Sequence, residues 1–122
     1  AARRLKNIAK ELNIWVLALS QLSRDNQNPL PSVNRLRGSG QINEAADITI
    51  LLYRPEVYNK RYPEPFQSTN PNGTAMIDIA KGRNVGVFKF IVGFNAATTH
   101  FYELNERPIL PFTENKSDDN PF

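Results

Sequence analysis

Two short stretches of this sequence combine basic residues with glycine in a pattern that suits phosphate. The first, NRLRGSGQ, carries Arg35 and Arg37 and no acidic residue. Gly38 and Gly40 follow. Arginine donates forked hydrogen bonds to phosphate oxygens, glycine lets backbone N–H groups approach an anion, and a helix starting near Gln41 would add its positive end. The pattern indicates a loop that grips an anion, and it equally fits a solvated turn built from common turn residues.

The second stretch, IAKGRNVG, places Lys81 and Arg83 at the tip between two predicted strands. Residues two apart in an extended backbone point to the same side, so both cations can reach one phosphate group. The alternative is a hairpin tip whose charges are simply solvated. A P-loop is excluded within these 122 residues, because neither Gly-Lys-Ser nor Gly-Lys-Thr occurs in them.

A third candidate is Gln21, which follows the apolar run IWVLALS (14–20). Ligands of open α/β sheets gather at the carboxyl ends of strands, where polar side chains are well placed to meet them. A glutamine amide both donates and accepts, so Gln21 could orient a water molecule or sense a phosphate oxygen. The alternative is that Ser20 and Gln21 only start a loop and bond the local backbone.

The elements that must position these residues follow from the apolar pattern. Residues 1–13 have apolar side chains at helical spacing and charges on the opposite face, which predicts an amphipathic helix. The continuous apolar runs 14–20 and 48–53 are typical of parallel strands buried on both faces. Residues 41–47 suit one or two helical turns. This order predicts an α/β sheet.

The second half of the chain follows a different pattern. Residues 55–73 carry four prolines and predict a long irregular excursion, with a tip that we expect to be disordered. Residues 74–80, 85–94 and 99–104 predict strands, and their short connections force antiparallel neighbours. We expect residues 105–122 to be a flexible tail.

Composition limits the classes of protein and site. With 122 residues and 40% hydrophobic residues the chain matches one domain with a real core. Its net charge of +3 permits an anionic partner without requiring one. Cysteine is absent and His100 is the only histidine, so we expect no metal site and a reducing compartment. No apolar run approaches the roughly 18–20 residues of a membrane span.

The three segments together resemble the carboxy-terminal half of the motor domain of DnaB-type replicative DNA helicases, which are hexameric, RecA-fold and ATP-driven. The matching segments are LKNIAKELNIWVLALSQLSR, LRGSGQINEAADITILLYRPEVY and IDIAKGRNVGVFKFIVGFN, within roughly residues 5–95. The resemblance implies a partial RecA-like (P-loop NTPase) core, in which parallel strands continue into antiparallel C-terminal strands. It places that half-domain at residues 1–104 and the tail at 105–122.

The resemblance also implies roles for the phosphate-facing residues. Gln21 matches the glutamine that senses the γ-phosphate in that family. Lys81 and Arg83 match the basic pair that reaches into the ATP site of the neighbouring subunit, with Arg83 as the arginine finger. All three are therefore candidate catalytic and nucleotide-binding residues.

The loop of Arg35, Arg37, Gly38 and Gly40 matches the one that grips the single-stranded DNA backbone in the central channel of the ring. The family usually has an acidic residue where this chain has Gly38, and a glutamine where it has Gly82. Both differences remove side-chain contacts, so the grip on DNA and the geometry of the site between subunits are expected to differ.

The implied cofactors are ATP and Mg²⁺, bound by a longer parent protein. The Walker A lysine and the catalytic carboxylate are not in this sequence, so we expect the chain to be part of that parent and inactive alone. Implied partners are single-stranded DNA, identical subunits in a hexameric ring, primase and a helicase loader, all in the cytoplasm and without a membrane. Alternatives are a recombinase-like or loader-like relative that binds DNA without unwinding it, and a degenerate RecA-like assembly module.

Overall fold

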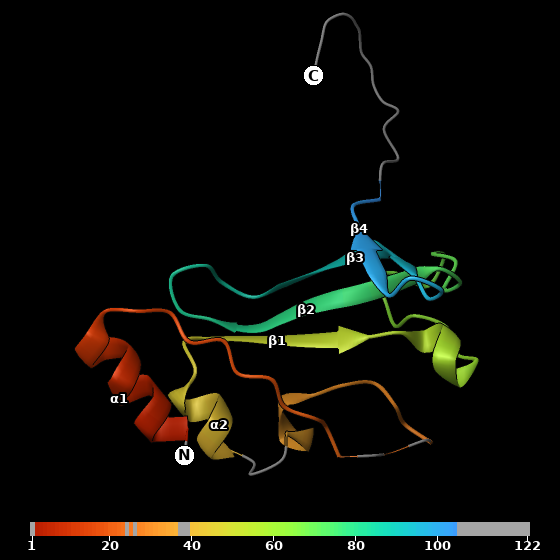
Figure 1. Ribbon diagram of the computed structural model, residues 1–122. Coiled ribbons are helices and arrows are strands. Elements are labelled where there is room, and N and C mark those ends of the chain that lie inside the picture. Colours follow the sequence, from red (N-terminus) through yellow and green to blue (C-terminus); the bar gives the residue numbers. More distant parts are fainter. Residues whose placement is uncertain (1, 24, 26, 37–39, 105–122) are drawn as a thin grey trace, which may run out of the picture.

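The computed structural model describes residues 2–23, 25, 27–36 and 40–104 (Figure 1). A helix and a long loop come first, and a second helix leads into four strands. The helices are α1 (Ala2–Leu12) and α2 (Gly40–Ala45), the strands are β1 (Ile48–Tyr53), β2 (Thr74–Gly82), β3 (Phe88–Asn95) and β4 (His100–Tyr102), and 3-10 turns lie at Val33–Arg35 and Pro55–Tyr58.

The four strands form one sheet in the order β1-β2-β3-β4, and each neighbouring pair is antiparallel. The antiparallel C-terminal strands predicted from the short connections are therefore confirmed. β1 also has its predicted bounds. Its pairing with β2 runs from Tyr53 opposite Met76 to Ile48 opposite Gly82, with a bulge between Thr49 and Ile50. The start of β1 thus lies beside the end of β2.

The predicted helix at the amino end is confirmed as α1. It ends where Asn13 adopts a left-handed backbone with φ of 55°, a conformation that asparagine tolerates better than most residues. Its apolar face, with Leu5 and Ile8, is only about half covered. α1 packs on α2, and Figure 1 shows both helices at the start of β1, with the Pro55–Tyr58 turn at the other end.

The prediction that residues 14–20 form a buried parallel strand is wrong for this structure. The segment after α1 runs as an irregular trace (Figure 1), and Trp15, Leu17 and Leu19 are 98, 85 and 92% exposed. A strand needs a hydrogen-bonded neighbour, and within the described residues no strand pairs with this segment. The apolar run predicted burial, and in this structure neither the burial nor the neighbouring strand is present.

The prediction that β1 is buried on both faces is also wrong. Thr49, Leu51 and Tyr53 are buried, while the residues that alternate with them are about half exposed. This alternation is the pattern of a strand covered on one face only.

The segment 55–73 covers the buried face of the sheet. Tyr62 is 2% exposed and packs with Tyr53 and Met76, with Phe66 against the same cluster. The Tyr62 hydroxyl lies 2.8 Å from Thr74 Oγ1, and burial raises the pKa of that phenol. The segment is irregular, as predicted, but the expectation of a disordered tip is wrong because its aromatic side chains complete the core.

The loop between α1 and α2 is closed by Arg35. Leu22 and Leu36 form an isolated antiparallel bridge, and the Ser23 N–H donates to the Arg35 carbonyl at 2.8 Å. The Arg35 guanidinium donates to the Ser23 carbonyl at 2.6 and 3.1 Å and to the Leu30 carbonyl at 2.9 Å. This planar group therefore holds both ends of the loop against each other.

Replacing Tyr62 with phenylalanine tests the hydrogen bond in the core. Thr74 Oγ1 also lies within hydrogen-bond distance of two backbone carbonyls, so Tyr62 is the natural donor to it. We expect Tyr62→Phe to lower the free energy of unfolding by about 1 kcal/mol in urea titrations followed by circular dichroism. Tyr58→Phe, at a residue that is 39% exposed, is the matched control. Equal effects of the two changes would contradict the assignment.

Replacing Arg35 with lysine tests the loop closure, because an ammonium group cannot span the same carbonyls in a fork. We expect amide hydrogen exchange at Ser23 to speed up by roughly tenfold, equivalent to about 1.4 kcal/mol. Arg4→Lys on the exposed face of α1 should leave that exchange rate unchanged. If Arg35→Lys also leaves it unchanged, the guanidinium does not close the loop.

Candidate functional site

The predicted phosphate sensor lies on the exposed loop after α1. Gln21 is exposed, directly before the Leu22–Leu36 bridge, and Ser20 Oγ approaches the Gln21 carbonyl at 3.4 Å. That contact is the local backbone bond expected of a residue that begins a loop. The sensing role of Gln21 stays a prediction.

The predicted DNA-binding loop is described only at its two ends. Arg37 and Gly38 lie outside the described residues, and Gly40 is the first residue of α2, which confirms the predicted short helix at this place. The donors of Arg35 are directed at carbonyls of its own loop. The structure thus gives Arg35 a loop-closing role, and its contact with DNA stays a prediction.

The hairpin between β2 and β3 has a tight tip that explains the glycine at position 82. The N–H groups of Val85 and Gly86 both donate to the Gly82 carbonyl, at 3.3 and 3.0 Å. A Cβ atom added to Gly82 would collide with the Gly86 carbonyl oxygen. A side chain here, such as the glutamine usual in the resembled family, would therefore require a different turn.

Both predicted cations of this tip lie on one side of the hairpin, where they meet the end of α2. Lys81 Nζ donates to the carbonyls of Asn43 and Glu44 at 2.6 and 3.2 Å. Arg83 Nη1 lies 3.4 Å from Asp47 Oδ1, and both side chains are largely exposed. Lys81 thus meets the end of α2, and Arg83 meets Asp47 in the short link between α2 and β1; that both cations face one phosphate stays a prediction.

Asp47 is the residue of this site that the sequence did not single out. Its Oδ1 accepts a hydrogen bond from Lys6 Nζ of α1 at 2.9 Å, and its carbonyl accepts one from the Arg83 N–H at 2.9 Å. The Lys6 hydrogen bond, supported by the charges of Arg83 and Lys81, lowers the pKa of the Asp47 carboxyl. The sequence showed only an acid between a helix and a strand, because nothing in it indicated how the hairpin folds back.

Thr49 adds a further tie at the same place. Its hydroxyl donates to the Asn43 amide oxygen at 2.9 Å, and Thr49 pairs with Lys81 across the sheet. α2 is thereby bound to β1 and to β2. The end of the predicted DNA-binding segment and the predicted phosphate-facing tip are thus joined through one short helix.

No group of three or more His, Cys, Asp or Glu side chains within the described residues can hold a metal ion. No helix in the part of the chain that the structure describes is long and apolar enough to cross a membrane.

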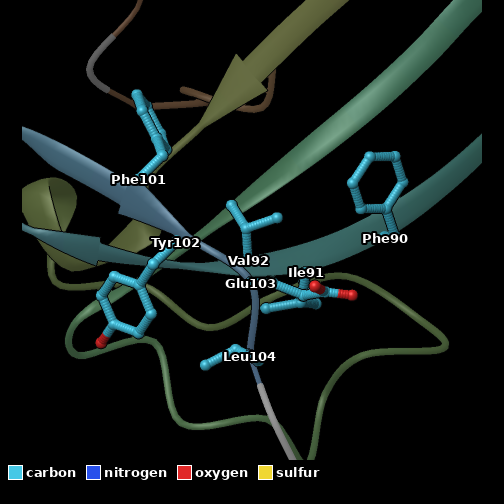
Figure 2. Close-up of a pocket in the computed structure, with 7 residues that line it drawn as sticks. All are labelled: Phe90, Ile91, Val92, Phe101, Tyr102, Glu103 and Leu104. Carbon is cyan, nitrogen blue, oxygen red and sulfur yellow. The ribbon is translucent and has the colours of Figure 1, made fainter. Parts of the chain in front are cut away.

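A hollow of about 700 Å³ lies beside β3 and β4. Figure 2 shows the side chains that line it. Apart from the Glu103 carboxylate its lining is apolar or aromatic, and no predicted site residue contributes to it. The lining residues are Phe90, Ile91, Val92, Phe101, Tyr102, Glu103 and Leu104.

Solved structures resemble this fold closely. The ATPase domain of G40P superposes with a TM-score of 0.71 at 34% identity, over 85% of this chain and 35% of that one. A DnaB-like replicative helicase, described together with its interactions with primase, gives a TM-score of 0.70 at 34% identity, over 85% of this chain and 24% of that one. The fold is therefore α/β and RecA-like, as the resemblance implied, but the described residues form no parallel pair of strands.

Curated relatives agree with this assignment. A probable replicative DNA helicase of Trieres chinensis is 38% identical over 108 residues, and the replicative DNA helicase DnaC of Bacillus subtilis is 38% identical over 109 residues. They align with 83 and 87% of this chain, which spans 22% of the length of each. The family of the DnaB-like helicase C-terminal domain matches residues 1–103. This chain therefore belongs to the DnaB-like helicase C-terminal domain family.

Proposed function

We propose that this chain is the carboxy-terminal part of the motor domain of a ring-shaped replicative helicase, which uses ATP hydrolysis to move along single-stranded DNA and unwind the duplex. The observation that carries the proposal is the hairpin tip, where Lys81 and Arg83 lie together on one side of the turn. The relatives named as replicative DNA helicases support it.

In this proposal the tip serves the ATP site of the neighbouring subunit. The Arg83 side chain is 62% exposed and stands at a turn, so a second subunit can reach it. A guanidinium there stabilises the charge that develops on the phosphate during transfer. ATP bound with Mg²⁺ supplies the phosphoryl group that passes to water. Among the described residues, Lys81 and Arg83 supply the cations that would face phosphate.

The proposed DNA contact lies on the segment that leads into α2. The donors of Arg35 are engaged with the Ser23 and Leu30 carbonyls, so we assign the main phosphate contact to Arg37 and to the backbone near Gly38 and Gly40. We assign the γ-phosphate contact to Gln21, which is exposed.

The proposed partners follow from a ring that works at a replication fork. We propose that identical subunits form a hexamer, in which Arg83 stabilises the phosphate of the ATP that the neighbouring subunit binds. One structural relative was described with its interactions with primase, and we propose primase and a helicase loader as partners here. We place the protein in the cytoplasm.

The role of Arg83 in a neighbouring subunit can be tested in the full-length ring. Removing an arginine finger lowers turnover by roughly 10³–10⁵-fold in other phosphoryl-transfer enzymes. We expect Arg83→Ala to abolish DNA-stimulated ATP hydrolysis while nucleotide binding and ring assembly persist. Lys81→Ala should lose less turnover, since a point charge lacks the two-pronged geometry.

Mixed rings provide the control for this experiment. Subunits with Arg83→Ala and subunits that lack the Walker A lysine should regain some hydrolysis when combined, because some interfaces then pair an intact ATP site with an intact finger. Normal turnover in rings made wholly of Arg83→Ala subunits would reject the finger and favour a hairpin tip whose charges are simply solvated.

The DNA contact can be tested through its salt dependence. Each phosphate contact on single-stranded DNA contributes about 0.7 to the slope of log affinity against log salt. We expect Arg37→Ala to weaken binding equally for all base sequences and to reduce the magnitude of the slope by about that amount per subunit engaged. A change in base preference would contradict a contact with the backbone.

A further inference from the structure

The guanidinium of Arg83 is held at one end only. Its Nη1 atom lies 3.4 Å from Asp47 Oδ1, and among the described residues no other hydrogen bond or ion pair reaches that side chain. A guanidinium has five N–H donors in a fixed fork. One contact therefore leaves most of the fork free for a second anion.

The carboxylate that holds Arg83 is itself fixed in place. Lys6 Nζ, from α1, donates to the same Oδ1 atom at 2.9 Å. The backbone of the tip is held independently, by the Arg83 N–H on the Asp47 carbonyl at 2.9 Å and by Lys81 on the Asn43 carbonyl at 2.6 Å. A change confined to the carboxylate would therefore alter the direction of the Arg83 side chain while the turn stays in place.

We propose that Asp47 is a positioning residue for Arg83, which holds one end of the guanidinium so that its other donors face the phosphate of the neighbouring subunit. This inference rests on the proposed function of the hairpin tip. A free arginine loses much rotamer freedom when it binds an anion, and a fixed carboxylate removes part of that loss before the reaction. An ion pair as exposed as this one is weak, so the expected gain in rate is about two- to fivefold.

The test is Asp47→Asn in the full-length ring, which keeps the shape of the side chain and the backbone carbonyl but removes the charge. We expect kcat for DNA-stimulated ATP hydrolysis to fall about two- to fivefold with KM for ATP unchanged, because the finger acts on the transition state. Asp47→Glu keeps the charge and should restore part of the rate. Asp78→Asn is the matched control, since Asp78 lies within β2 opposite Leu51. We expect the kcat of this variant to equal that of the unchanged protein.

A double variant decides whether Asp47 acts through Arg83. In single-turnover hydrolysis of radiolabelled ATP, adding Asp47→Asn to Arg83→Ala should cause no further loss. If Asp47→Asn lowers the rate of Arg83→Ala rings by the same factor as it lowers the rate of rings with Arg83 intact, the inference is overturned. Asp47 would then act elsewhere, for example through Lys6. An unchanged or raised kcat for Asp47→Asn would overturn it as well.

Measuring Arg83→Ala beside these variants distinguishes a failure of the proposed arginine finger from a failure of the positioning role of Asp47. If Arg83→Ala loses hydrolysis while Asp47→Asn does not, only the positioning role fails. If Arg83→Ala hydrolyses ATP normally, the proposed finger fails and the positioning role fails with it.

Discussion

The hydrogen bonds from Lys81 to the last turn of α2 are the contacts that place the hairpin tip beside that helix. The final carbonyls of a helix have no partners within the helix, and a helix of six residues is too short to be stable alone. Lys81 satisfies two of these carbonyls, at Asn43 and Glu44. The hairpin tip and α2 therefore hold each other in place, and residues far apart in the chain share one small region.

In this arrangement Lys81 and Arg83 have different roles. An ammonium group has three donors, and Lys81 directs it at two carbonyls, so within its own subunit it acts mainly as an anchor. Among the described residues the Arg83 side chain makes one contact, which leaves most of its donors unused there. Gly82 between them is required by the close approach of the Gly86 carbonyl. A side chain at this position would therefore need a different turn.

The sequence predicted best what depends on local pattern. The bounds of β1 and the antiparallel order of the later strands followed from apolar runs and short connections. It failed for residues 14–20, because a run of apolar side chains indicates burial but does not identify the covering element. It also missed that Tyr62 completes the core and that Asp47 receives the hairpin tip, since both contacts join segments distant in the chain. Arg35 shows the same limit, because only the folded loop reveals that its donors serve backbone carbonyls.

We propose that the hairpin tip is anchored on its own subunit and acts on the ATP site of the next. A cryo-electron microscopy structure of the full-length ring, with a non-hydrolysable ATP analogue and single-stranded DNA, tests it most directly. The account predicts the Arg83 guanidinium within about 3 Å of a γ-phosphate oxygen of the neighbouring subunit's nucleotide, with Lys81 still on the carbonyls of Asn43 and Glu44. An Arg83 side chain that faces solvent at every nucleotide-bound interface, or that contacts the nucleotide of its own subunit, would contradict it.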